Sequence, residues 1–268
     1  MINQEIKKRE KIAILACRQV GKLLLANFGR RLSVKSKGDR DLVTNIDQRA
    51  DRIITGLIKK NFPEDGLISE ESPHSSSRSG YSWIIDPIDG THNFVHRIEV
   101  FGTSLAVAFN NQVVLGAIFM PVGDELYLAR KGSGAFCNGK KITVSQRPLR
   151  ESTIIYDSSI RYNRVKMLKA LAEVAERAFN VRMFGSTVRS LTYVAQGKAE
   201  AEIEFNDKVW DFAAGLLLVE EAGGKSTDFQ GQPWTLNTQG YIAANGIIHS
   251  QLLRMVKKAE REDGSKKG

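Results

Sequence analysis

The chain has 268 residues, of which 42% are hydrophobic, 26% charged and 8% aromatic, and this composition excludes disordered, collagen-like and coiled-coil chains. At about 150 residues per domain, the length predicts one large domain or two small ones, with a core large enough to need no disulfides. The net charge is +9, but because the charges are spread along the chain they indicate a solvated basic surface rather than a nucleic-acid site.

Two helices are predicted in the first 62 residues. Apolar side chains recur every three or four positions over residues 4–28 and again over residues 45–62, which is the period of an amphipathic helix. Pro63 ends the second of these patterns. We expect the polar segment 35–41 to connect these two helices. The serine-rich segment 72–80 is typical of a mobile surface loop.

After residue 80 the pattern changes to short apolar runs that are typical of strands. The predicted strands cover residues 81–85, 103–109, 113–119 and 125–129. Turn residues separate the last three of these runs, so we expect a meander of antiparallel strands. Asn138-Gly139 is the strongest two-residue hairpin signal in the chain and joins residues 134–137 to residues 141–144.

Beyond Pro148 the predicted strands alternate with helices. Strands are predicted at 153–156, 181–184, 199–205 and 241–244, and helices at 164–179, 187–196, 211–222 and from His249 onward. Helices followed by a meander, and then alternating strands and helices, indicate a layered protein of the α+β class. We expect two parts, an N-terminal part over residues 1–148 and a C-terminal part over residues 149–268.

Cysteine usage and hydropathy bear on location. The two cysteines, Cys17 and Cys137, do not suggest a secreted disulfide scaffold, which favours a reducing compartment. No apolar run approaches the roughly 18 residues that cross a membrane. The first residues also lack the apolar core of a signal peptide. We therefore expect a soluble cytoplasmic protein that does not enter a membrane.

The segment with the clearest chemistry is residues 86–94, which read DPIDGTHNF and follow a predicted buried strand. Asp86 and Asp89 lie on a proline-containing turn, and paired carboxylates suit a hard divalent cation such as Mg²⁺. The backbone N–H groups of Gly90 and Thr91 could hold a phosphate. The same letters also fit an Asx-type turn without a ligand, so this segment alone leaves both interpretations open.

Three other acidic segments accompany it. They are Asp41 and Asp47 before the second predicted helix, Glu70-Glu71 after an apolar stretch, and Asp211 before an apolar helical run. Each alone is also explained as a helix cap or a solvated strand end. Taken together with Asp86 and Asp89, they favour a shared metal site over separate helix caps.

These segments resemble, in order and spacing, the motifs of the inositol monophosphatase family of Mg²⁺-dependent, lithium-sensitive phosphatases. Residues 86–94 look like its first signature and residues 210–215 (WDFAAG) like its second. The two other acidic elements match 41–47 (DLVTNID) and Glu70-Glu71, and 134–139 (GAFCNG) resembles the family's hairpin. The resemblance runs from about residue 5 to residue 250, nearly the whole chain.

The resemblance implies a fold, a metal content and an assembly. The implied fold is α+β, a layered αβαβα sandwich of the inositol monophosphatase and fructose bisphosphatase type, with the metal site between two sub-domains. The family is usually homodimeric and binds two or three Mg²⁺ ions per subunit. By motif position, Glu70, Asp86 and the carbonyl of Ile88 would hold the first ion, and Asp86, Asp89 and Asp211 the second.

The resemblance also implies roles for the neighbouring residues. Thr91, supported by Asp47, would orient the attacking water, and Glu70 would help to activate it. The phosphate would bind at Asp89 and at the N–H groups of Gly90 and Thr91.

The part of the substrate that carries hydroxyl groups would contact Gly185, Ser186, Thr187 and Glu204. Alternation along residues 199–205 sends Glu200, Glu202 and Glu204 to one face of a strand. The alternative to a substrate contact is that this face of the strand is exposed to solvent. Of the two lysines before Asp41, we expect Lys37 rather than Lys35 to reach the metal site.

The expected function is an Mg²⁺-dependent phosphomonoesterase that hydrolyses inositol 1-phosphate or a similar polyol or sugar phosphate with metal-activated water. Relatives that act on fructose 1,6-bisphosphate, 3′-phosphoadenosine 5′-phosphate or histidinol phosphate are alternatives, although His92-Asn93 favours the inositol and sugar branch over the nucleotidases.

An alternative of another class is a non-catalytic regulatory protein associated with RNA. The sequence has neither basic–aromatic interleaving nor a helix-turn-helix pattern, so a nucleic-acid partner is not expected. A purely scaffolding protein would also have no chemical need for the metal-binding carboxylates. We expect a small phosphomonoester and a second copy of the chain as partners.

Overall fold

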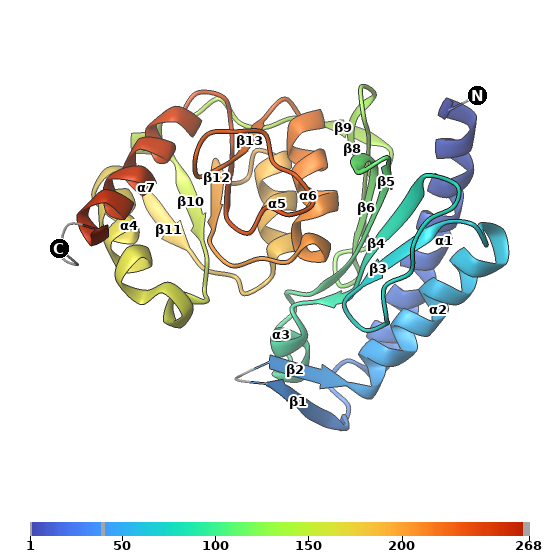
Figure 1. The fold of residues 1–268 in the computed structure, drawn as a ribbon. Coiled ribbons are helices and arrows are strands. Elements are labelled where there is room, and N and C mark those ends of the chain that lie inside the picture. Colours follow the sequence, from blue (N-terminus) through green and yellow to red (C-terminus); the bar gives the residue numbers. More distant parts are fainter. Residues whose placement is uncertain (1, 39–40, 265–268) are drawn as a thin grey trace.

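The computed structural model describes the backbone of residues 2–38 and 41–264 and the side chains of residues 3–35 and 44–259. Two β-sheets are separated by a pair of helices, and each sheet carries another pair on its outer face (Figure 1). The layers in order are α1 and α2, the larger sheet, α5 and α6, the smaller sheet, and α4 and α7. The predicted αβαβα sandwich is therefore confirmed.

The larger sheet has seven strands in the order β3-β4-β5-β6-β7-β8-β9. Their bounds are Gly66–Ser69, Tyr81–Asp89, Gly102–Phe109, Gln112–Met120, Glu125–Arg130, Gly134–Cys137 and Lys140–Ile142. All neighbours from β4 onward pair antiparallel, which confirms the predicted meander, and β3 adds a parallel edge strand. The β4–β5 register shifts between Asp86 and Asp89, and such an irregularity re-aims side chains.

Helices α1 (Ile2–Asn27) and α2 (Asn45–Asn61) cover the outer face of this sheet. Each buries one apolar stripe, which is why the sequence shows a helical period over these segments. The start of α2 is fixed by a capping box, in which Thr44 Oγ1 accepts from the N–H of Asp47 at 3.4 Å and the Asp47 carboxylate accepts from the N–H of Thr44 at 2.8 Å. These hydrogen bonds hold the Asp47 side chain in place in the first turn of α2.

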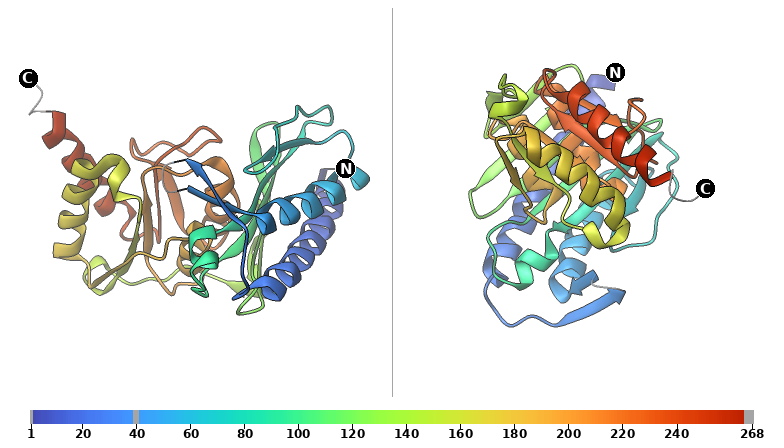
Figure 2. Two further views of the ribbon diagram at one scale, coloured as in Figure 1. Left: turned by 90° about the horizontal axis from the view of Figure 1, so that it is seen from below. Right: turned by 90° about the vertical axis from the view of Figure 1, so that its left-hand side faces the viewer.

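The smaller sheet has five strands in the order β11-β10-β12-β14-β13. Their bounds are Asn180–Arg182, Thr153–Tyr156, Ala201–Glu204, Tyr241–Ala244 and Lys225–Asp228. Helices α4 (Arg164–Arg177) and α7 (His249–Gly264) lie side by side on its outer face (Figure 2). Helices α5 (Thr187–Ala195) and α6 (Val209–Glu221) cover its inner face.

Helix α6 lies between the two sheets and joins them. Its residues from Phe212 to Val219 are all buried, because a helix between two sheets has no solvated side. One hydrophobic cluster contains α6 together with buried residues of both sheets, such as Ile84 and Ala243.

The predicted division of the chain at residue 148 stays a prediction. Among the described residues, no helix is both long and apolar enough to cross a membrane.

The polar connection over residues 35–41 includes two short strands that the sequence did not predict. Strands β1 (Val34–Gly38) and β2 (Asp41–Thr44) pair antiparallel there, with Val34 opposite Thr44. Backbone pairing within a polar stretch leaves no hydrophobic period, so the sequence gives no sign of it. The short helix α3 (Thr91–Val95) and strand β13 were also not predicted.

Residues 72–80 lie mostly at the surface, as expected, but hydrogen bonds hold the segment at both ends. The N–H of Ser75 donates to the carbonyl of Leu67 at 2.9 Å, and the N–H of Arg78 donates to the carbonyl of Glu64 at 2.8 Å. The hydroxyl of Ser72 donates to Asp51. The segment is thus an anchored surface loop, and its mobility stays a prediction.

Gly116 allows β6 to pack closely against α6. Replacing it by alanine should loosen this contact between the larger sheet and the helix. A Cβ atom at Gly116 would lie 2.7 Å from the carbonyl oxygen of Ala214. Because both atoms belong to packed elements, we expect Gly116→Ala to destabilise the fold by about 1–3 kcal/mol in urea unfolding. The control is Gly56→Ala in α2, where a Cβ atom meets nothing within 4 Å. It should stabilise the fold by up to about 1 kcal/mol. Equal effects of the two substitutions would contradict the packing argument.

Candidate metal centre

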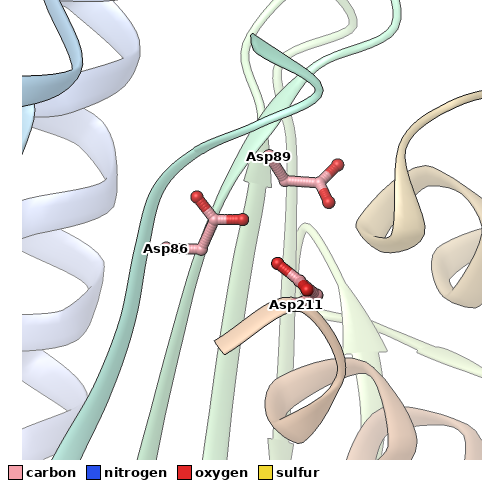
Figure 3. A group of neighbouring side chains, drawn as sticks. All are labelled: Asp86, Asp89 and Asp211. Atoms are coloured by element: carbon pink, nitrogen blue, oxygen red, sulfur yellow. The ribbon is translucent and has the colours of Figure 1, made fainter. Parts of the chain in front are cut away.

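Three aspartates from two segments that lie far apart in the sequence converge in one place. Asp86 and Asp89 lie at the end of β4, and Asp211 lies in the first turn of α6. One carboxylate oxygen from each residue lies within 4.8 Å of the others (Figure 3). Oxygen atoms at this spacing are within reach of a shared cation, because metal–oxygen distances for Mg²⁺ are about 2.0–2.1 Å.

Hydrogen bonds from neighbouring backbone fix two of these carboxylates. Asp89 accepts from the N–H of Thr187 at 3.1 Å and from the hydroxyl of Ser186, which caps α5. Asp211 accepts from the N–H of Lys208 at 2.7 Å. Its side chain therefore caps α6 and also belongs to the cluster. The ends of β4, α5 and α6 therefore meet at one point, and each contributes polar groups there.

The charges of the cluster fit a site that binds a cation. Oδ1 of Asp86 is fully buried, and among the described residues no group donates a hydrogen bond to it. Burial raises the pKa of Asp86 well above its ordinary value, and the charges of Glu70, Asp89 and Asp211 raise it further. Such a carboxylate is costly unless it binds a proton or a cation. The oxygen ligands present fit a hard divalent cation such as Mg²⁺.

Glu70 lies directly after β3, and its N–H donates to the carbonyl of Ile85 at 3.2 Å. Its charge contributes to the raised pKa values of both Asp86 and Asp211. The structure brings three of the four predicted carboxylates together, those of Asp86, Asp89 and Asp211, and the place of Glu70 among them stays a prediction.

The predicted water-binding pair is also in contact. The hydroxyl of Thr91 lies 2.9 Å from Oδ1 of Asp47 and 2.9 Å from the carbonyl oxygen of Ile88, and its one proton is donated to either of these two acceptors. Burial raises the pKa of Asp47, while hydrogen bonds from Thr44 and Thr91 oppose that increase. The turn needs Gly90, because its φ is +79° and a Cβ atom would lie 2.8 Å from the carbonyl oxygen of Val100.

A cavity of about 330 Å³ extends from Asp89 and Asp211 along the end of the smaller sheet. The four predicted contacts of the substrate's hydroxyl-bearing part, Gly185, Ser186, Thr187 and Glu204, all line it. Glu202 also lines the cavity, and Glu200 is buried beside Arg147. The alternative of a solvated strand face is therefore wrong for these glutamates.

Sequence reasoning missed two acidic residues of this cavity, Asp157 and Asp207. Asp157 follows β10 and accepts from the N–H groups of Ser159 at 2.5 Å and Phe205 at 3.1 Å. Asp207 accepts from the hydroxyl of Thr187 at 3.1 Å. An acidic residue at the end of a predicted strand was the available signal for Asp157.

The prediction for Lys37 stays untested, since its side chain lies outside the described residues.

The raised pKa of Asp89 leads to a prediction about the metal-free protein. Burial raises it from 3.8 to about 6, so ionisation disfavours folding as the pH rises through that range. The stability contributed below the unfolded pKa is then lost, on the order of 3 kcal/mol. In EDTA, we expect the wild type to lose thermal stability relative to Asp89→Asn between pH 4 and pH 7. Parallel melting-temperature curves would show that Asp89 ionises normally.

Comparison with known proteins agrees with this geometry. A family model described as the inositol monophosphatase family matches residues 5–261. A fructose-1,6-bisphosphatase/inositol-1-monophosphatase of Thermotoga maritima is 36% identical over 95% of this chain and 98% of its own. A histidinol-phosphatase of Chlorobaculum parvum is 35% identical over 94% of this chain and 97% of its own.

Solved structures share the whole fold. The extragenic suppressor protein suhB of Bartonella henselae superposes with a TM-score of 0.91 at 34% identity, covering 94% of this chain and 99% of that one. An IMPase/NADP phosphatase complexed with Mg²⁺ and phosphate has a TM-score of 0.83 at 27% identity, covering 94% and 95%. With a family model over nearly its full length and relatives above 30% identity, the chain belongs to the inositol monophosphatase family and is a phosphatase of that family.

Proposed function

We propose that the chain is an Mg²⁺-dependent phosphomonoesterase that acts on inositol 1-phosphate or a similar polyol or sugar phosphate. The observation that carries this proposal is the convergence of Asp86, Asp89 and Asp211, two of which also line a cavity rich in hydroxyl and carboxyl groups. The names of the relatives, which include inositol and fructose phosphatases, support the substrate class.

In this proposal, two or three Mg²⁺ ions bind per subunit. Glu70, Asp86 and the carbonyl of Ile88 hold the first ion, and Asp86, Asp89 and Asp211 hold the second. Bound Mg²⁺ lowers the pKa of a water molecule and stabilises the leaving oxygen of the ester. The donorless Oδ1 of Asp86 and the Mg²⁺ named for a structural relative support this assignment.

The chain's own groups then orient the reacting molecules. Because the Thr91 hydroxyl gives its proton to Asp47 or to the Ile88 carbonyl, its lone pairs are directed to accept a hydrogen bond from water. Glu70 receives the proton of that water, which makes it the general base. The N–H groups of Gly90 and Thr91 bind the phosphate, with Asp89 alongside.

The alcohol part of the substrate lies in the cavity. Gly185, Ser186 and Thr187 form one wall, and Glu204 accepts hydrogen bonds from hydroxyl groups of the substrate. We keep Lys37 as the proposed lysine of the metal site. The histidinol-phosphatase name of one relative makes an amino alcohol phosphate a second candidate substrate.

We further propose a homodimer and a cytoplasmic location. Phe179 is 76% exposed and Met183 is 42% exposed, on either side of the edge strand β11. An exposed aromatic side chain next to an unpaired strand edge is a surface that a second chain can cover. The free thiols of Cys17 and Cys137 suit a reducing compartment. Light scattering of the purified protein measures the oligomeric state.

Release of inorganic phosphate tests the proposed function. The substrates are inositol 1-phosphate, fructose 1,6-bisphosphate, 3′-phosphoadenosine 5′-phosphate, histidinol phosphate and phenyl phosphate, each with Mg²⁺ and with EDTA. We expect Mg²⁺-dependent release from inositol 1-phosphate that EDTA abolishes. Activity that survives EDTA would contradict the metal mechanism, and a stronger preference for another ester would correct the substrate.

A further inference from the structure

Asp51 is a buried carboxylate that the proposed chemistry does not use. It lies in the middle of α2, and it is only 3% exposed. Each of its carboxylate oxygens accepts one hydroxyl group: Oδ1 accepts from Ser69 at 2.6 Å, and Oδ2 accepts from Ser72. Within the described part of the chain, these two hydroxyls are the only hydrogen-bond donors to the carboxylate. A carboxylate is costly to bury, so its place in the core points to a role in holding the two serines.

Ser69 and Ser72 lie on either side of the proposed general base. Glu70 and Glu71 stand between them in the sequence. Ser69 ends β3, and its Oγ also accepts from the N–H of Glu71 at 3.3 Å. The N–H of Glu70 donates to the carbonyl of Ile85 in β4 at 3.2 Å. Residues 69–72 are therefore fixed to α2 through two hydroxyl groups and to β4 through the backbone.

Helix α2 holds a second part of the proposed machinery in the same way. Asp47 lies one turn before Asp51, and residues four positions apart share one face of a helix. Oδ1 of Asp47 accepts from the hydroxyl of Thr91 at 2.9 Å. One helix therefore holds the hydroxyl proposed to orient water and the segment proposed to carry the base. Its two points of attachment are about 6 Å apart along the helix axis.

We infer that Asp51 is a positioning residue that fixes the carboxylate of Glu70 through the two serine hydroxyls. This inference rests on the proposed roles of Glu70 as metal ligand and general base. Glu70 follows the last residue of an edge strand, where the backbone leaves the sheet. Catalysis needs reacting groups in a fixed geometry, so a base in such a place must be supported by its neighbours. The two hydrogen bonds to Asp51 supply that support before metal or substrate binds.

Hydrogen exchange tests this support without metal or substrate. Asp51→Ala removes both hydrogen bonds, so in EDTA the amide hydrogens of residues 69–72 should exchange at least about 10-fold faster than in the wild type. Ser72→Ala removes one of the two bonds and should give a smaller increase; it carries the test if Asp51→Ala folds poorly. The matched control is Ser79→Ala. The hydroxyl of Ser79 donates at 2.6 Å to another buried aspartate, Asp65, so its loss should leave exchange of residues 69–72 unchanged.

Metal binding and turnover test the consequence for Glu70. In calorimetry, Asp51→Ala should weaken Mg²⁺ binding about 10-fold, as is usual when a group that supports a metal ligand is lost. For phenyl phosphate, kcat should fall about 10-fold while KM stays within about 2-fold, because Asp51 has no proposed contact with the substrate. Asp51→Asn can accept from one serine and donate to the other, so it should restore most of both losses. Ser79→Ala should match the wild type.

A double-mutant cycle shows whether the effect passes through Glu70. Glu70→Gln removes the charge of the proposed ligand and should itself weaken Mg²⁺ binding. If Asp51 acts through Glu70, adding Asp51→Ala to Glu70→Gln should weaken binding by less than about 2-fold further. A second loss of about 10-fold in that background would show that Asp51 acts on the fold as a whole, and the inference would be wrong.

The remaining outcomes separate this inference from the proposed function. If Asp51→Ala leaves the exchange of residues 69–72 unchanged, the inference is wrong and the phosphatase stands. The same holds if exchange rises but Mg²⁺ affinity and kcat stay within about 2-fold of the wild type. If the wild type hydrolyses no ester, the proposed function fails. Exchange in EDTA and Mg²⁺ calorimetry then still decide whether Asp51 positions a metal-binding Glu70.

Discussion

Replacing Asp86 by asparagine should abolish phosphatase activity and leave the chain folded. Asp86 is proposed to contact both metal ions, so its loss weakens the activation of water and the stabilisation of the leaving oxygen together. We expect kcat to fall on the order of 1,000-fold or more, equivalent to about 4 kcal/mol. The measurement is Mg²⁺-dependent phosphate release at saturating substrate.

The same variant has an expected signature in stability. In the metal-free protein the Asp86 carboxylate is buried beside three others, which raises its pKa through burial and repulsion. Asparagine removes that repulsion, so the melting temperature in EDTA should be unchanged or higher. Mg²⁺ should raise the melting temperature of the wild type and much less that of Asp86→Asn.

A matched control excludes a general effect of losing an aspartate. Asp228 lies at the end of β13, where it accepts from the N–H groups of Gln230 and Gln232 in a turn away from the metal centre. Asp228→Asn should keep full activity. Near-normal activity of Asp86→Asn, or an equal loss in both variants, would contradict the bridging role.

The long helices could be predicted because their buried apolar residues recur with a regular helical spacing in the sequence. Residues 4–28 and 45–62 carry one apolar stripe each, and the structure places α1 and α2 there with ends displaced by one or two residues. The central strands of the larger sheet were equally visible as apolar runs. Strands β1 and β2 were not, because they pair through backbone groups in a polar segment.

The metal centre could be predicted because its residues lie in short contiguous motifs. Two acidic residues of the cavity beyond it, Asp157 and Asp207, could not, because their contacts depend on pairing between distant strands. The parallel pairing of β10 with β12 places Tyr156 opposite Ile203, and this register brings Asp157 next to Glu204. No spacing within the sequence of either strand indicates that contact, and neither does the shared hydroxyl of Tyr241 between Glu202 and Asp207.

Replacing Thr91 by valine should give the second large loss of activity. The hydroxyl of Thr91 donates its proton to Asp47 or to the Ile88 carbonyl, each at 2.9 Å, which leaves its lone pairs directed at the proposed water site. Valine keeps the shape of the side chain and removes this acceptor, so the water loses its orientation. We expect kcat to fall about 100-fold, or roughly 2.7 kcal/mol, with little change in KM.

Two further variants test whether the hydroxyl itself is responsible. Thr91→Ser keeps the oxygen and should retain activity within about 10-fold of the wild type. Asp47→Asn keeps the shape of the acceptor but removes its charge, so it weakens the orientation of the hydroxyl and should cost less than Thr91→Val. Calorimetry with Mg²⁺ should give the same affinity for all three variants, because none of these groups is a proposed metal ligand. If Thr91→Val instead weakens Mg²⁺ binding as much as it lowers kcat, Thr91 supports the Ile88 carbonyl at the metal rather than the attacking water.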